Sequence, residues 1–268
     1  MTGSGERLSR SDVIELRSRL NERDLHILEH VGSLRLLCAR QIQALLFPVE
    51  MHANAQTAAR SCRRVLERLT RERLLVRLQR RVGGVRAGSA SFVYCLGTVG
   101  QRILDAGGPR RRLAEPSARF VDHTLAVGDF LVDLHVQARA GRWELDEWQS
   151  EPQCWRQVMT LGGRLTLRPD LFITLLAAGY ELRWFIEIDR GTEHLPALQR
   201  KYRLYHSYYK NGDEQKHHSV FPRVLWITTD ERRAARLRAA IVAETRLTPG
   251  LFHVTTEEHA LDLIGAVP

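Results

Sequence analysis

Three acidic residues in strand-like segments are the most chemically informative feature of the sequence. Asp170 lies near the start of one β-rich run, and Glu187 and Asp189 lie at the end of the next. Both runs are rich in β-branched and aromatic residues, and Ala178 and Gly179 between them can form a tight turn. We therefore predict a β-hairpin that carries all three carboxylates.

A turn centred between Ala178 and Gly179 places Asp170 directly opposite Glu187 on one side of the ladder. Asp189 shares that side because alternate residues of a strand point the same way. Carboxylates held a few ångströms apart repel each other unless they are protonated or bridged by a cation, and oxygen ligands on rigid strands suit Mg²⁺ or Mn²⁺. The pattern predicts a divalent-metal site made by Asp170, Glu187 and Asp189.

The order of elements around these acids resembles the core of the PD-(D/E)XK restriction-endonuclease-like superfamily. More narrowly, several segments resemble the replication-relaxation family, which is associated with plasmids and integrative elements and is akin to the C-type mobilisation relaxases. The resemblance covers about residues 22 to 263. It rests on Arg168-Pro169-Asp170, on 184–193 with Glu187 and Asp189, on Lys201-Tyr202 to Tyr205, and on 221–228.

The resemblance implies a metal-dependent DNA endonuclease or nickase with Asp170, Glu187, Asp189 and Lys201 as catalytic residues. Asp189 departs from the pattern, because it stands where the superfamily has a lysine two residues after the acid. Lys201, about two turns into the following helix, could supply the missing cation from a migrated position. Asp129 or Asp122, on an earlier predicted helix, is a candidate outer acid.

Composition and charge narrow the class of protein. The chain has 268 residues, 44% of them hydrophobic, and four widely separated cysteines without a Cys-x-x-Cys pair. No run of about 18 uncharged apolar residues occurs, so we expect a globular protein of a reducing bacterial cytoplasm that does not enter membranes. Walker, dinucleotide-binding and serine-hydrolase motifs are not found in the sequence.

The positive charge is concentrated in the first part of the chain. Residues 1–115 carry 21 Arg, no Lys and 11 acidic residues, a balance of +10, whereas residues 116–268 carry 19 basic and 20 acidic residues, a balance of −1. High genomic GC content would explain the preference for arginine but not this asymmetry. The distribution favours a nucleic-acid-binding domain attached to a neutral one.

The basic part has the organisation of a winged helix-turn-helix. Helical patterns over 21–31, 38–47 and 54–73 precede two strand-like runs, 74–78 and 91–96, around a basic loop. The third helix would enter the major groove and the hairpin would contact phosphates or the minor groove. The predicted DNA contacts are Arg60, Arg63, Arg64 and Arg68 on the third helix and Arg80, Arg81 and Arg86 on the wing. Ion pairs of these arginines with Glu67 or Glu72 are the alternative.

These patterns predict a two-domain α/β (α+β) fold. Residues 1–20 form an N-terminal extension, 21–105 the winged helix-turn-helix, 106–116 a linker and 117–268 a restriction-endonuclease-like αβββαβ core. In the second domain the predicted helices span 117–139, 195–209 and 232–244, and the later strands span 223–228 and 251–254. Tyrosines at helical spacing in 202–209 either pack or present a nucleophile, and packing is the commoner use.

Two function classes remain open. The first is a replication-relaxation or mobilisation protein that nicks DNA with Mg²⁺ or Mn²⁺. The second is a catalytically inactive DNA-binding accessory protein or regulator that keeps the nuclease-like domain as a scaffold. Both have double-stranded DNA as partner, both admit contacts with other mobilisation or replication proteins, and both leave a homodimer open.

Overall fold

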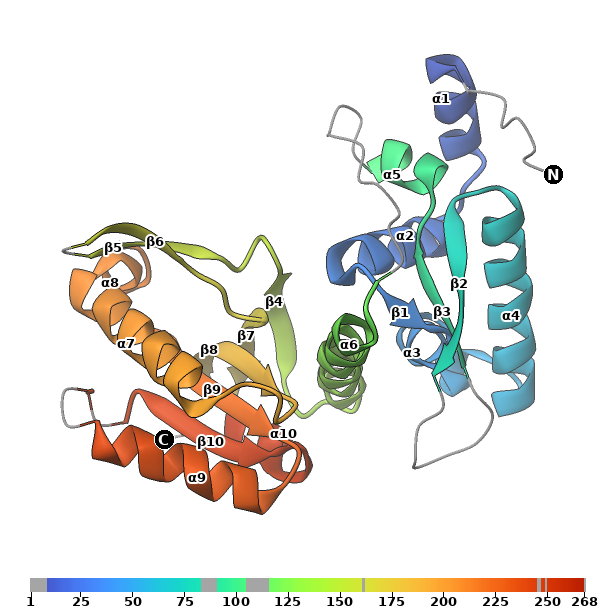
Figure 1. The fold of residues 1–268 in the computed structure, drawn as a ribbon. Coiled ribbons are helices and arrows are strands. Elements are labelled where there is room, and N and C mark those ends of the chain that lie inside the picture. Colours follow the sequence, from blue (N-terminus) through green and yellow to red (C-terminus); the bar gives the residue numbers. More distant parts are fainter. Residues whose placement is uncertain are drawn as a thin grey trace. The chain divides into compact units, whose positions relative to one another are not determined.

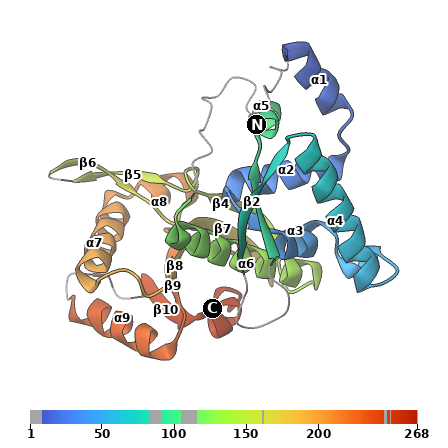
Figure 2. The same ribbon diagram turned by 45° about the vertical axis from the view of Figure 1, so that its right-hand side comes forward.

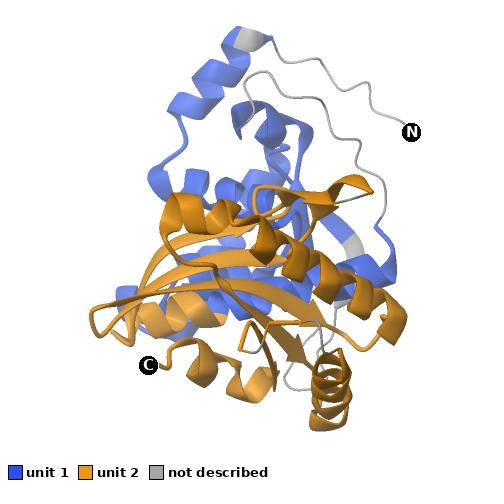
Figure 3. Ribbon diagram, turned by 90° about the vertical axis from the view of Figure 1, so that its left-hand side faces the viewer, with its two compact units in different colours: residues 1–132 blue, residues 133–268 orange. Residues whose placement is uncertain are grey.

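The protein folds into two compact units, residues 1–132 and residues 133–268 (Figure 3). A computed structural model describes residues 9–82, 91–104, 116–160, 162–244, 247–248 and 250–267. Helices and strands are mixed in both units, which confirms the predicted mixed α/β class. Among the described residues, no helix is both long enough and apolar enough to cross a membrane.

The first unit combines helices with a small antiparallel sheet of order β1-β3-β2 (Figure 1). The three predicted helices and two predicted strands are all present, whereas α1, β1, η1 and α5 were not predicted. The elements are α1 (Arg10–Ser18), α2 (Glu22–Leu34), β1 (Leu37–Cys38), α3 (Ala39–Leu46), the 3₁₀ turn η1 (Val49–Met51), α4 (Ala55–Arg71), β2 (Leu75–Val82), β3 (Ser91–Leu96), α5 (Thr98–Leu104) and the start of α6 (Ala118–Arg139).

Helix α4 begins and is oriented for simple reasons. Its N-cap Asn54 accepts a hydrogen bond from the backbone N–H of Thr57 at 2.9 Å, which satisfies one of the free donors of the first turn. Ala58, Cys62, Leu66 and Leu69 recur at helical spacing and are buried. The predicted apolar stripe is thus confirmed, and the opposite side of the helix remains available to solvent.

A buried carboxylate ties α2 to α4. Asp24 is 1% exposed, caps the start of α2 with Asn21, and accepts a hydrogen bond from Arg68 of α4 at 2.5 Å. The pKa of Arg68 is raised because Asp24 stabilises its charged form. Arg68 also contacts Glu72 at 3.4 Å. Its charge is therefore paired within the unit, and Glu72 is one of the acids named in the ion-pair alternative, while the DNA contact by Arg68 stays a prediction.

The two compact units divide within α6, later than the predicted linker at 106–116, which lies outside the described residues except for residue 116. Gln41 of α3, itself fully buried, donates hydrogen bonds to the backbone carbonyl of Leu125 at 2.7 Å and to Asp129 at 2.8 Å. A Cβ at Gly128 would lie 2.9 Å from the Gln41 amide, so glycine permits this close approach. These contacts attach the first half of α6 to the first unit. Asp129 takes part in this attachment as the acceptor of a hydrogen bond from Gln41.

The second unit is built on a five-stranded sheet of order β10-β9-β8-β7-β4 (Figure 1). Strands β4, β7 and β8 are antiparallel, and β9 and β10 continue parallel to β8. The elements are β4 (Glu144–Ser150), β5 (Arg156–Thr160), β6 (Gly163–Leu167), β7 (Leu171–Ala177), β8 (Tyr180–Asp189), α7 (Leu195–Asn211), α8 (Asp213–His218), β9 (Arg223–Thr228), α9 (Glu231–Ala243), β10 (Phe252–Thr256), the 3₁₀ turn η2 (Glu257–His259) and α10 (Ala260–Ile264).

The β7–β8 hairpin has the predicted turn and register. Ala178 has φ 47° and Gly179 has φ 82°, so both turn residues adopt the left-handed backbone that two-residue hairpin loops require. Leu171 pairs with Ile186 and Ala177 with Tyr180. Asp170 directly precedes β7 instead of lying inside it, and the prediction missed the separate β5–β6 hairpin that ends at Leu167.

The core of the second unit fills the sheet face that carries Phe172, Phe185 and Trp226. Helices α7 and α9 cover this face, and their buried side chains join one apolar cluster. Tyr202 and Tyr205 of α7 are fully buried there, and the Tyr202 ring meets Trp226 edge-on at 4.5 Å between centroids. Packing is therefore the main role of these tyrosines, and it fixes the position of α7 on the sheet.

The Asp24–Arg68 pair generates a stability prediction. Asp24→Ala should lower the free energy of unfolding by roughly 2 kcal/mol, because it removes a helix cap and leaves the half-buried Arg68 without its main partner. Urea denaturation measures this loss. Glu15→Ala is the control, because it breaks the exposed Glu15–Arg19 pair and should cost less than about 0.5 kcal/mol. Equal losses in the two variants would contradict the assignment.

Candidate functional site

The three predicted acids lie at one end of the β7–β8 hairpin and are all buried. Asp170 is 9% exposed, Glu187 3% and Asp189 6%. Asp170 accepts a hydrogen bond through Oδ2 from the backbone N–H of Ile188 at 2.7 Å, and its own N–H donates to the carbonyl of Ile186 at 3.1 Å. These bonds fix Asp170 against β8, at the side chain of Glu187.

Glu187 is the centre of the cluster and has two partners from α7. The ammonium group of Lys201 donates to Oε2, and the Tyr205 hydroxyl donates to Oε1 at 2.6 Å. Lys201 thus points at the acids from the next helix, as predicted. Tyr205 was missed, although its position four residues after Lys201 places both side chains on one face of the helix.

The charges of this cluster are strongly coupled. Burial raises the pKa of Glu187 to about 8, and Asp170 adds to this effect, whereas Lys201 opposes it. Burial disfavours the ammonium form of Lys201, but the attraction of Glu187 and Asp170 outweighs that cost and raises the pKa of Lys201 above its usual value. Lys201 therefore remains a cation at neutral pH, directly against Glu187.

Asp189 has a different set of partners. Its Oδ2 accepts a hydrogen bond from Nε of Arg233 on α9 at 2.7 Å, and its Oδ1 accepts from the backbone N–H of Gly191 at 2.8 Å. Arg233 also donates to the carbonyl of Glu193 at 2.8 Å. The Asp189–Arg233 pair therefore fastens the segment between β8 and α7, and nothing in the local sequence identifies Arg233 as the partner.

The Tyr202 hydroxyl lies in the same region without a hydrogen-bond partner among the described residues. Burial raises the pKa of Tyr202, and Asp189 strengthens this effect. A buried phenol with an ordinary or raised pKa is a poor nucleophile because the reactive phenolate is disfavoured. The tyrosine-nucleophile alternative is therefore not supported at this position.

The donor set suits a divalent ion only in part. Asp170 and Glu187 are hard oxygen donors at a common place, but Arg233 and Gly191 engage both oxygens of Asp189. Within the described part of the chain, no three His, Cys, Asp or Glu side chains are placed to hold one metal ion together. A third protein ligand from Asp189 does not fit this arrangement, and Lys201 supplies positive charge where the acids converge.

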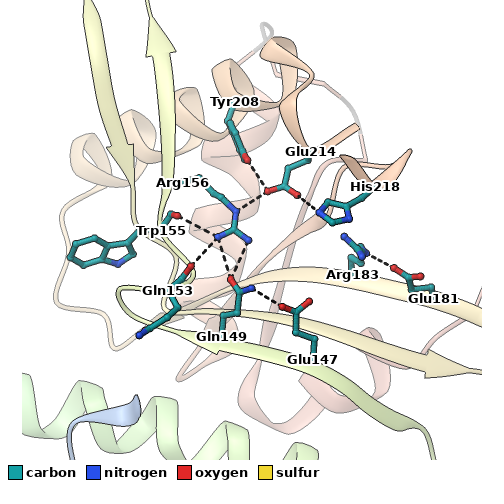
Figure 4. A network of polar contacts seen from close by, with 10 residues as sticks. All are labelled: Glu147, Gln149, Gln153, Trp155, Arg156, Glu181, Arg183, Tyr208, Glu214 and His218. Atoms are coloured by element: carbon teal, nitrogen blue, oxygen red, sulfur yellow. Dashed lines mark hydrogen bonds and ion pairs between the residues drawn. The ribbon is translucent and has the colours of Figure 1, made fainter. Parts of the chain in front are cut away.

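A second buried ion pair holds the start of β5 against α8 (Figure 4). Arg156 donates through Nε to Glu214 at 2.8 Å, and the Tyr208 hydroxyl donates to the same carboxylate oxygen at 2.7 Å. The remaining donors of Arg156 reach Gln149 and the backbone carbonyls of Gln153 and Trp155. This network was not predicted, because its members are scattered over four segments of the sequence.

In the first unit, α4 presents the predicted arginine face. Arg60, Arg63 and Arg64 are exposed, and in the described part of the chain none of them forms an ion pair, with Glu67 or any other acid. Arg80 and Arg81 fall within β2 rather than in the loop after it, but their side chains, like all of Arg86, lie outside the described residues.

Comparison with known proteins places the chain in a family. Residues 28–224 match the replication-relaxation family, which is well over half of the chain. The protein belongs to the replication-relaxation family. The match spans the α4 arginines, the acids of β8 and Lys201, but it ends before α9 and Arg233. No curated protein and no solved structure matches the chain.

The raised pKa of Glu187 generates a pH prediction. Between its ordinary value of 4.5 and its folded value of about 8, the native state keeps a proton that the unfolded state has released. The stabilising contribution is therefore full at low pH and is lost as pH rises through about 8. The free energy of unfolding should fall by at most about 1.4 kcal/mol per pH unit in this window.

Urea denaturation at intervals between about pH 5 and 8 measures this slope. Glu187→Gln should flatten the dependence of the free energy of unfolding on pH. The slopes are compared, and not the absolute stabilities, because the variant also removes the charged partner of Lys201 and so lowers stability at every pH. Glu181→Gln, which changes an exposed carboxyl of the same strand, should keep the wild-type slope. Identical slopes in the wild type and Glu187→Gln would contradict the proposed titration.

Proposed function

We propose that this replication-relaxation protein binds double-stranded DNA in the replication or mobilisation of a plasmid or integrative element. The observation that carries the proposal is the exposed face of α4, where Arg60, Arg63 and Arg64 have no acidic partner among the described residues. Arginine clustered on one helix face is the usual electrostatic footprint of a nucleic-acid-binding domain. The concentration of charge in residues 1–115 supports the same conclusion.

The order of elements in the first unit supports a winged helix-turn-helix. Helix α2, strand β1, helices α3 and α4, and the antiparallel pair β2–β3 follow one another as that architecture requires. In such a domain α4 would read the major groove, and Arg80, Arg81 and Arg86 would contact the backbone from the wing. The Asp24–Arg68 pair would keep α4 rigid, so that its exposed arginines meet DNA without further ordering.

A second candidate function is metal-dependent nicking by the second unit. The observation that favours it is the contact between Lys201 and Glu187. Asp189 stands where the resembling nucleases have a lysine, and Lys201 of α7 would supply that positive charge instead. Asp170 and Glu187 would hold Mg²⁺ or Mn²⁺, which supplies activation of water and neutralisation of charge at a phosphate. Lys201 would stabilise negative charge on the phosphate, and Tyr205 would orient Glu187.

The accessory function remains the alternative to nicking. Asp189 is engaged by Arg233 in a structural pair, so the acidic end of β8 also serves to hold α7 and α9. In an accessory protein the buried cluster would be a scaffold, and the second unit would contact a second copy or another mobilisation or replication protein. DNA binding by α4 is common to both functions, and both fit a bacterial cytoplasm.

DNA binding is tested on the arginine face. Full-length protein should bind duplex DNA with an affinity that falls steeply with salt, because arginine–phosphate contacts release counterions. Arg63→Ala with Arg64→Ala should weaken binding at least about tenfold, since each base-contacting arginine contributes roughly 1–3 kcal/mol. Fluorescence anisotropy over a salt series measures both effects.

The control removes the same charge elsewhere in the first unit. Arg17→Ala with Arg19→Ala removes two exposed arginines, one in the last turn of α1 and one at its C-cap, and should change the affinity by less than about twofold. Binding that does not depend on salt, or equal losses in the two double variants, would contradict the proposal for α4.

Nicking is tested on supercoiled plasmid that carries the origin of the element. If the acids are catalytic, Mg²⁺ or Mn²⁺ should support conversion to open circles, and Asp170→Ala or Glu187→Ala should abolish it while DNA affinity is retained. Lys201→Ala should slow nicking by about 10²- to 10³-fold, as expected for loss of one donor that stabilises the transition state. Gel electrophoresis follows the conversion.

Glu258→Ala, an exposed acid outside the cluster, is the matched control and should nick at the wild-type rate. Tight binding of origin DNA without nicking in titrations of both metals would reject the nickase and favour the accessory function.

A further inference from the structure

The β5–β6 hairpin is a two-stranded sheet of the second unit, separate from the five-stranded sheet (Figure 2). Both of its ends lead to the acidic cluster. Cys154, two residues before β5, donates through Sγ to the carbonyl of Pro169 at 3.0 Å, and Asp170 follows Pro169. The hairpin is therefore an extension of the same backbone that carries the acids.

The base of the hairpin is held firmly. Val158 and Leu167 are fully buried in the core beneath α7. Arg156 is fixed by Glu214, and its guanidinium also lies over the ring of Phe172, 5.2 Å from the centroid. Near the tip, the Asn211 side chain donates to the carbonyl of Met159 at 3.1 Å. These contacts anchor the described part of the hairpin to the second unit.

The register of the hairpin separates its two faces. Gln157 pairs with Thr166 and Met159 with Arg164, so these four side chains share the face opposite to that of Val158 and Leu167. Gln157 and Arg164 are exposed, and Met159 is 59% exposed. Gln157 and Thr166 also hydrogen-bond to each other across the ladder at 3.3 Å.

This outward face has the chemistry of a surface that reads DNA. Glutamine and threonine are side chains that hydrogen-bond to base edges, an apolar group such as that of Met159 can contact a thymine methyl, and an arginine at the edge of the ribbon can pair with a phosphate. No acidic residue occurs from Arg156 to Arg168, and both Arg164 and Arg168 are exposed. The charge of the hairpin therefore complements the phosphate backbone.

We propose that the β5–β6 hairpin inserts its outward face into the major groove of duplex DNA. A two-stranded ribbon fits the groove, which is about 12 Å wide, and strands of five residues reach about 17 Å from the base of the hairpin. The second unit thereby has its own DNA contact, on a hairpin whose ends join the segments next to Asp170. The inference rests on the proposed DNA binding and extends it from the α4 arginines to the second unit.

Photocrosslinking of the full-length chain tests the inference. A p-benzoylphenylalanine at position 159 should give a covalent adduct with bound duplex DNA on irradiation. The same group at position 242, where Val242 of α9 is 80% exposed, is the control and should give none. Gel-shift titration of each protein with the same DNA, before irradiation, shows whether the duplex is bound.

Arg164→Ala gives an independent measurement. Loss of one phosphate contact should lower the slope of log affinity against log salt by about 1, whereas Arg236→Ala, an exposed arginine of α9, should leave the slope unchanged. Equal slopes for wild type and Arg164→Ala, together with no adduct at position 159 on bound DNA, would overturn the hairpin contact and leave the α4 proposal standing.

Two other outcomes are also decisive. An adduct at position 159 with a second copy of the chain, and none with DNA, would overturn the inference and identify the hairpin as a self-association surface. Absence of any gel shift with the wild type would instead reject the proposed function, and the hairpin contact with it.

Discussion

A carboxylate buried on a central strand needs a proton or a cation, and Glu187 imposes this requirement on the second unit. Lys201 and Tyr205 meet this requirement from one face of α7. Their two contacts fix the position of α7 over β8 and its rotation about the helix axis. The aromatic core beneath α7 supplies most of the apolar burial, but it would tolerate a shifted helix more readily than these two hydrogen bonds do. Asp170 adds negative charge and keeps Lys201 charged.

The same logic applies to Asp189. Its carboxylate accepts a hydrogen bond from Arg233, and this pair fastens the segment that leads into α7. Lys201 lies on the helix that begins after this segment. Asp189 is thus linked to both neighbouring helices, and a change at Asp189 would act on Lys201 through the position of α7.

The first unit also has a buried acid that pairs with a basic residue of a helix, and there the pair orients the helix α4. Asp24 holds Arg68 and so orients α4, leaving the remaining arginines of that helix exposed. Arg68 lies on the same helix as Arg63 and Arg64, yet its ion pair with Asp24 joins α4 to α2. The proposed contacts of α4 and of the β5–β6 hairpin would give each unit a DNA contact of its own.

The sequence by itself determined the mixed fold, the three helices and two strands predicted in the first unit, and the β7–β8 register. These follow from short-range rules, since periodicity, a two-residue turn and helical spacing act within a few residues. The resemblance added the prediction that Lys201 reaches the acids from the next helix. Tertiary structure alone decided that Asp189 pairs with Arg233, that Arg156 pairs with Glu214, and that Arg68 pairs with Asp24. Each of these partners is more than 40 residues away in the chain. Which charges meet at such separations depends on the packing of whole helices against the sheet, which local patterns do not encode.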